Sequence, residues 1–240
     1  MKKIIFSLRL YLDNCGFFSI ENGGGAHFHV AMMANMTYPF YEAEEWNKFA
    51  PNTLKQLLIR STNVLGYKPQ PKNVMRRTGE MICEHYDVVR CFDFLNHIEN
   101  MRPFAEVAMN STRNIFEPAI SLTQAAGFDI AHYMRVVEEI MAMIQSVSGF
   151  SGAKTQKSFI LGLKDMAGMC SPTFIRELVT AIRKTYPDLL LHYHRHYTDG
   201  LFVPAVGAAA KAGVQILDIA MGTFIFYAFG NNSNAFTSFF

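Results

Sequence analysis

Short apolar runs alternate with helix-period segments along most of the chain. Seven of these runs are rich in Val, Ile, Leu and Phe and are bounded by polar turns, and several are apolar at nearly every position, as is typical of strands buried on both faces. Segments of helical periodicity lie between them, so the pattern indicates repeated βα units and a parallel sheet. The predicted strands are residues 17–21, 54–61, 87–93, 116–123, 159–166, 189–196 and 214–221.

Five helices are predicted, over residues 71–84, 96–109, 130–147, 172–184 and 201–212. Even spacing without a long linker favours an α/β fold of the (β/α)8 TIM-barrel type over an open doubly wound sheet. The barrel is predicted to be incomplete, with about seven βα units. Residues 4–12 could form a helical turn or a makeshift strand, but they leave no room for a complete first unit.

The two ends of the chain differ in pattern. We expect the barrel to occupy residues 1–220, with its first βα unit degenerate or missing, and an atypical tail to follow at residues 221–240. Residues 219–240 contain no charged side chain, six phenylalanines and an Asn-Asn-Ser-Asn patch. Such a segment is poor helix material and would promote aggregation if exposed. Two interpretations stay open: a tail that packs on a partner, or non-native sequence in place of a lost C-terminus.

Composition narrows the function classes. Of the 240 residues, 50% are hydrophobic, and 22 Lys and Arg face 20 Asp and Glu, so the net charge of +2 lacks the basic excess that nucleic-acid binding demands. The four cysteines lack the spacing of a zinc or redox site, and Arg9 interrupts the apolar start that imitates a signal peptide. No apolar run is long enough to span a bilayer. We therefore expect free thiols and a cytoplasmic location.

Three histidines alternate along the predicted strand 189–196. Because a strand sends alternate side chains to one face, His192, His194 and His196 point the same way. Catalytic groups of an α/β barrel collect at the carboxyl ends of its strands, which places His194 and His196 at the mouth, where they could bind a divalent metal. Satisfied core or surface histidines are the commoner explanation of such a pair, and His192 is interpreted as a hydrogen-bonded core residue.

A lysine and an arginine end two other predicted strands. Lys164 is costly to bury, so an ion pair with Asp165 or another carboxylate, or extension to the rim, would explain it structurally. Reaction with CO2 would instead convert its amine into a carbamate, an anionic ligand that could join His194 and His196. Arg60 suits bidentate capture of a substrate carboxylate, although a structural ion pair is equally common.

These residues together resemble a known family. The Lys-Asp-Met-Ala-Gly segment at residues 164–168, the His-x-His pair on the next strand and Arg60 in a Leu-Ile-Arg-x-x-Asn context are similar to the carboxyltransferase domain of biotin-dependent enzymes. That group contains pyruvate carboxylase, the oxaloacetate decarboxylase alpha subunit and the transcarboxylase keto-acid subunit. The similarity extends from about residue 17 to about residue 220, through residues 21–26, 88–93, 119–121 and 212–214.

The resemblance implies an α/β barrel and a role for each matching residue. Lys164, carboxylated, with His194 and His196 would hold a divalent metal (Zn, Mn or Co), and Lys164 is the catalytic residue. Arg60 would grip the carboxylate of a 2-oxo acid, and Tyr67 would lie beside the biotin pocket. Biotin would be carried on a partner protein or domain, since no Met-Lys-Met attachment signature occurs here.

Several positions depart from the family pattern. The first strand, with its Arg-Asp-x-x-Gln signature and metal-binding Asp, has no counterpart, and Asp13 matches the helix that follows that strand. His29 replaces an Asp of the family, and Tyr197 stands where Asp usually follows the His-x-His pair. The part beyond the barrel, which supplies a catalytic threonine, also finds no match.

The sequence thus predicts a biotin-dependent carboxyltransferase or decarboxylase component that moves CO2 between carboxybiotin and pyruvate or oxaloacetate. Its expected partners are a biotin carboxyl carrier and the 2-oxo acid, with a membrane involved only through a pump complex, and a homo-oligomer stays open. The alternative is a non-catalytic, truncated remnant of such a barrel, whose exposed strand edges would invite dimerisation. A metal-dependent lyase or synthase acting on an acyl-CoA is a distant third.

Overall fold

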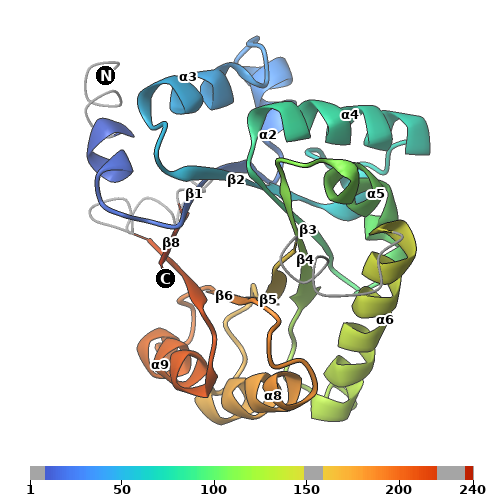
Figure 1. The fold of residues 1–240 in the computed structure, drawn as a ribbon, viewed down its shortest axis with the longest axis vertical. Coiled ribbons are helices and arrows are strands. Elements are labelled where there is room, and N and C mark those ends of the chain that lie inside the picture. Colours follow the sequence, from blue (N-terminus) through green and yellow to red (C-terminus); the bar gives the residue numbers. More distant parts are fainter. Residues whose placement is uncertain (1–8, 149–158, 221–235, 240) are drawn as a thin grey trace.

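The computed structural model describes residues 9–148 and 159–220 and the backbone of residues 236–239. Seven parallel strands, paired in the order of the sequence, curve into a barrel with helices on its outside (Figure 1). This arrangement confirms the predicted α/β fold class. The parallel strands are β1 (Ser19–Gly24), β2 (Leu54–Ile59), β3 (Val88–Asp93), β4 (Ile115–Ser121), β5 (Leu161–Asp165), β6 (Leu191–Arg195) and β7 (Ile216–Ile219).

An antiparallel strand occupies the eighth position. β8 (Phe236–Phe239) pairs with β1 on one side and with β7 on the other, and thereby closes the ring. Within the described residues the barrel lacks an eighth βα unit, as predicted, but β8 spans the gap that we expected between the first and last parallel strands. It comes from the segment that we predicted as a separate tail. The boundary at residue 220 stays a prediction, and residues 221–235 and 240 lie outside the described residues.

The five predicted helices appear near their expected positions, one of them divided. The predicted helix 96–109 divides into a 3-10 turn, η3 (Ile98–Met101), and α5 (Arg102–Asn110). The division falls at Pro103, in the first turn of α5, because proline has no N–H with which to continue the preceding turn. The sequence analysis did not predict α3 (Tyr41–Phe49), which buries only Ala43, or the short segments α2 (His27–His29), the π-helical η1 (Val30–Ala34) and η2 (Ser61–Asn63). The other helices are α4 (Lys72–His85), α6 (Ile130–Ser148), α8 (Pro172–Thr185) and α9 (Phe202–Ala212).

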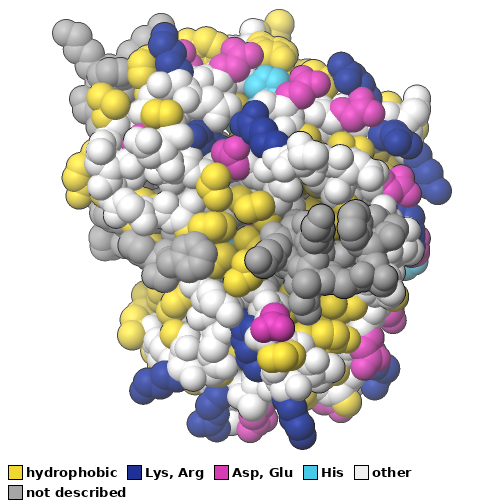
Figure 2. Space-filling view, in the orientation of Figure 1, with side chains coloured by type: hydrophobic (Ala, Val, Ile, Leu, Met, Phe, Trp, Pro, Cys, Tyr) yellow, Lys and Arg dark blue, Asp and Glu magenta, His cyan; other side chains and the backbone are white. Residues whose placement is uncertain are grey.

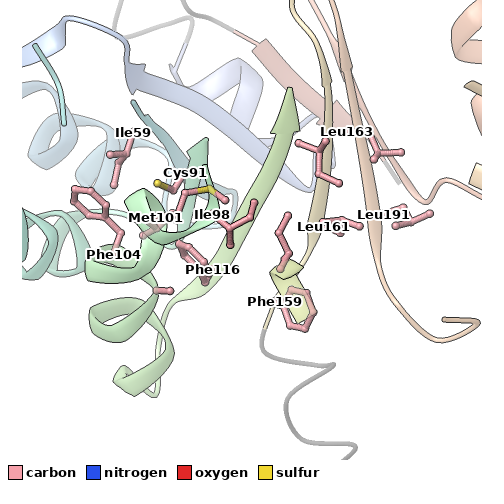
Figure 3. Close-up of a cluster of buried hydrophobic side chains, with 14 of the residues drawn as sticks. Ile59, Cys91, Ile98, Met101, Phe104, Phe116, Phe159, Leu161, Leu163 and Leu191 are labelled. Atoms are coloured by element: carbon pink, nitrogen blue, oxygen red, sulfur yellow. The ribbon is translucent and has the colours of Figure 1, made fainter. Parts of the chain in front are cut away.

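Strand alternation separates an apolar layer from a polar interior. Leu161 and Leu163 of β5 belong to the large cluster of buried hydrophobic side chains between strands and helices (Figure 3). Lys164 follows Leu163 and therefore faces the inside of the barrel. Gly162 faces inward too, because a Cβ there would lie 2.7 Å from Cβ of Ala119 and 3.0 Å from Oε1 of Glu117. The fold thus places apolar side chains outside the ring and charged ones within it.

The outer surface carries charges of both signs. Lys and Arg lie among Asp and Glu around the visible face, without one extended patch of either sign (Figure 2). Among the described residues, no helix is long and apolar enough to cross a membrane.

The loop after β5 packs tightly against the end of β6, which makes Gly168 a sensitive position. Gly168 has φ +64°, and a Cβ there would contact Oγ1 of Thr198 and lie 2.6 Å from the backbone oxygen of His196. Gly127 has a similar φ of +84° with no atom within 4 Å of a built Cβ. We predict that Gly127→Ala lowers the free energy of unfolding by about 1–2 kcal/mol through φ alone, and that Gly168→Ala lowers it by roughly 1–3 kcal/mol more through the clash.

Urea unfolding of the two variants beside the unsubstituted protein measures both losses. Equal losses of unfolding free energy in the two variants would show that the loop after β5 has room for a Cβ at position 168 beside His196.

Candidate functional site

An arginine and three carboxylates fill the centre of the barrel. Arg90 of β3 is 1% exposed, and its Nε donates to Oε1 of Glu117 on β4 at 2.6 Å. Its Nη1 donates to Oε2 of Glu21 on β1 at 2.9 Å and to Oδ2 of Asp218 on β7 at 2.7 Å. Burial opposes the charge of Arg90, but the three carboxylates outweigh burial and raise its pKa. These ion pairs join four strands across the interior.

His192 belongs to the same network. Its Nε2 lies 2.7 Å from Oδ1 of Asp218, and its Nδ1 lies 3.1 Å from Oε2 of Glu117. The side chain is fully buried. Burial lowers the pKa of His192, but the two carboxylates outweigh burial and raise it overall. His192 is therefore a buried, hydrogen-bonded histidine, as the sequence indicated.

Lys164 lies beside this network and opposite His194. The two residues are paired across β5 and β6, and Lys164 is 5% exposed, with Nζ 5.3 Å from the ring of Phe92. Asp165, one of its expected partners, instead accepts a hydrogen bond from Nη1 of Arg195 at 2.7 Å. The burial of Lys164 also rules out the extension of its side chain to solvent at the rim. Burial lowers the pKa of Lys164 to about 8, against the opposing effect of nearby carboxylates. The amine is therefore more often neutral at physiological pH than that of an exposed lysine.

The two histidines of the predicted pair lie against each other. The ring centroids of His194 and His196 are 5.0 Å apart with an interplanar angle of 71°. Burial and then the positive charge of Lys164 lower the pKa of both rings, that of His194 strongly, so both imidazoles are neutral. The structure thus gathers Lys164, His194 and His196 at one place, while their role as metal ligands stays a prediction.

The chemical form of Lys164 decides how well these residues fit a metal ion. Across residues 9–148 and 159–220, no group of three or more His, Cys, Asp or Glu side chains is arranged to hold a metal. Neutral imidazoles are good ligands, but an ammonium repels a cation. A divalent metal would fit this site best with Lys164 as a carbamate, which would add an anionic oxygen ligand to the imidazoles of His194 and His196.

Arg60 and Tyr67 form a second group at the end of β2. The guanidinium carbon of Arg60 lies 5.6 Å from the ring centroid of Tyr67, and that ring contacts His29 edge-on at 5.2 Å. Tyr67 is 59% exposed. Because the carboxyl ends of parallel strands share one rim of a barrel, this group opens on the same end as Lys164. Its role in substrate binding stays a prediction.

Four members of the interior network escaped the sequence analysis: Glu21, Arg90, Glu117 and Asp218. A signal was present for three of them, because Arg90, Glu117 and Asp218 are charged residues within largely apolar strands, as in Val-Val-Arg-Cys-Phe-Asp of β3. Glu21 lies in the polar strand β1 and gave no such signal. Asp13, in contrast, is remote from this network. It lies in the helical residues 9–13, and its carboxylate accepts from the backbone N–H groups of Asn52 and Thr53, which precede β2.

The amino-acid sequence is similar to those of known pyruvate carboxylases. The chain is 36% identical over 210 residues to mitochondrial pyruvate carboxylase of Homo sapiens, covering 85% of this chain and 17% of the human protein. It is 32% identical over 211 residues to a pyruvate carboxylase subunit of Methanothermobacter thermautotrophicus, covering 88% and 34% of the two chains. A scan against protein-family models finds no match.

Solved structures agree with these relatives. The carboxyl transferase domain of Rhizobium etli pyruvate carboxylase, determined with pyruvate and biocytin, superposes with a TM-score of 0.75 at 30% identity, over 88% of this chain and 34% of that chain. The chain thus spans only a part of each of these relatives. On sequence and fold together, the chain is homologous, over about 85% of its length, to the carboxyltransferase region of the pyruvate carboxylases.

Proposed function

We propose that this chain performs biotin-dependent carboxyl transfer, moving CO2 between carboxybiotin and a 2-oxo acid such as pyruvate or oxaloacetate. The observation that carries the proposal is the convergence of Lys164 with two neutral imidazoles inside a barrel homologous to pyruvate carboxylase. The biotin would come on a partner protein or domain. A cytoplasmic location stays a prediction, and a homo-oligomeric state stays open.

Lys164, as a carbamate, would hold a divalent metal (Zn, Mn or Co) together with His194 and His196. Such a metal, when bound, supplies Lewis-acid polarisation of a keto oxygen. The charges around Lys164 support the replacement of its ammonium by a carbamate and a metal. A carbamate plus a divalent cation carry a single positive charge, as the ammonium does. Glu21 and Asp218, which act electrostatically on Lys164, would therefore face an unchanged net charge.

Arg60 would bind the carboxylate of the 2-oxo acid. Its guanidinium carbon lies 5.6 Å from the ring of Tyr67 at the carboxyl end of β2, and this packing limits the directions in which its donors can point. A planar guanidinium matches a carboxylate with two parallel hydrogen bonds. The exposed ring of Tyr67 would offer an apolar surface to the carboxybiotin that enters the mouth.

A non-catalytic barrel remnant is the second candidate function. The resemblance implies four metal ligands, one of them an aspartate on the first strand. Among the described strands we identify no aspartate that replaces it, and a site with three ligands favours the non-catalytic remnant. No observation favours an acyl-CoA lyase or synthase. Metal content and turnover distinguish the two leading candidates.

Substitution of Lys164 tests the site directly. We predict near-stoichiometric divalent metal in the purified chain and oxaloacetate decarboxylation with a biotinylated carrier, and at least a tenfold loss of both in Lys164→Gln, which cannot form a carbamate. Lys184→Gln removes a lysine from the last turn of α8 and serves as the matched control. Elemental analysis and a pyruvate-release assay measure the two effects. Absence of metal and turnover in the unsubstituted chain, under conditions where an intact pyruvate carboxylase is active, would favour the remnant.

Substitution of Arg60 tests the substrate contact. We predict that Arg60→Gln raises KM for oxaloacetate about 10- to 100-fold, because a charge-assisted contact of about 1.5–3 kcal/mol is lost, while metal content is unchanged. Arg76→Gln, which removes an exposed arginine of α4, is the control. Steady-state kinetics at saturating carrier measures KM, and an unchanged KM in Arg60→Gln would remove Arg60 from the substrate site.

A further inference from the structure

Asp218 connects the buried network to the predicted metal ligands. Its Oδ2 lies 2.7 Å from Nδ1 of His194 and also accepts from Nη1 of Arg90 at 2.7 Å. Its Oδ1 lies 2.7 Å from Nε2 of His192. Asp218 is 2% exposed, so water does not compete appreciably for these contacts. Both carboxylate oxygens of Asp218 are thus engaged by nitrogens at short distance.

These contacts determine where the proton of His194 resides. A carboxylate paired with a buried guanidinium is ionised, and an ionised carboxylate can only accept hydrogen bonds. The ring nitrogen that faces it must therefore be the donor. A neutral His194 with its proton on Nδ1 carries its lone pair on Nε2, and only a nitrogen with a lone pair can bind a cation.

We propose that Asp218 is a positioning residue of the site, which holds His194 in the Nδ1-protonated tautomer and thereby makes Nε2 the metal-binding nitrogen. This inference deepens the proposed function and rests on it. A carboxylate that accepts from the second nitrogen of a ligating histidine both orients the ring and raises its basicity, and its loss typically weakens metal binding 10- to 100-fold.

Glu117 provides a matched control. Its carboxylate contacts Arg90 and His192, which Asp218 also contacts: Oε1 lies 2.6 Å from Nε of Arg90, and Oε2 lies 3.1 Å from Nδ1 of His192. It is equally buried. Among the contacts of the described residues, the hydrogen bond to His194 belongs to Asp218 and not to Glu117. Glu117→Gln therefore perturbs the network without removing the proposed positioning contact.

The first experiment reads the tautomer in metal-free protein, so that its outcome is independent of turnover and of metal binding. Two-bond ¹H–¹⁵N spectra of ¹⁵N-histidine-labelled protein distinguish a protonated Nδ1 from a protonated Nε2, and His194→Gln identifies the His194 signals. We expect Nδ1 to be protonated in the unsubstituted protein and in Glu117→Gln. Protonation on Nε2 of His194 in the unsubstituted protein would overturn the proposal.

The second experiment measures affinity for Co²⁺ by titration in bicarbonate buffer. We expect Asp218→Asn to bind Co²⁺ about 10- to 100-fold more weakly than the unsubstituted protein, Glu117→Gln to lose less, and Asp218→Glu to recover part of the loss. Equal losses in Asp218→Asn and Glu117→Gln would overturn the positioning role and leave Asp218 a structural member of the network. If neither the unsubstituted protein nor any variant binds Co²⁺ while His194 is protonated on Nδ1, the proposed function fails and the tautomer assignment stands.

Discussion

Arg90 is buried at the centre of the barrel, and its ion pairs join strands that lie far apart in the sequence. Glu21, Glu117 and Asp218 come from β1, β4 and β7, so one guanidinium links the first, middle and last parallel strands. Removing one partner from a buried ion pair leaves an uncompensated charge and typically costs about 3–5 kcal/mol. The interior therefore depends on all four groups being present together, and this dependence fixes the relative positions of the strands that carry the site.

The candidate site is built on this frame. His194 donates to one of the carboxylates that Arg90 holds, and Lys164 feels the charges of Glu21, Arg90 and Asp218. An unmodified Lys164 supplies one positive charge to an interior with three carboxylates. A carbamate with a divalent cation would supply the same charge, so the network would face the same net charge in either form. The frame that stabilises the fold is thus also the electrostatic environment in which a carbamate and a metal are compatible with burial.

The sequence predicted much of the fold because short apolar runs, several of them nearly continuous, alternate with segments of helical periodicity. All seven parallel strands and the positions of Lys164, His194 and His196 on adjacent strands followed from that pattern. It failed where the determining contacts are long-range. The closing strand β8 lies in a segment without helix or barrel signal, and α3 buries too little apolar surface to stand out.

The interior network was missed for a different reason. Arg90 and Asp218 are 128 positions apart, and strand alternation shows that each faces inward without showing which charges meet. Charged residues in buried strands should have drawn attention, since burial is costly without a partner. Their partners become identifiable only when the barrel brings the strands around one centre.

The central claim is that Lys164 becomes a carbamate in this setting, and ¹³C NMR tests it most directly. Protein equilibrated with ¹³C-bicarbonate near pH 8 in the presence of Zn²⁺ is predicted to show a protein-bound carbamate resonance that is missing in Lys164→Gln. Absence of the resonance from the unsubstituted protein, or its persistence in Lys164→Gln, would contradict the account.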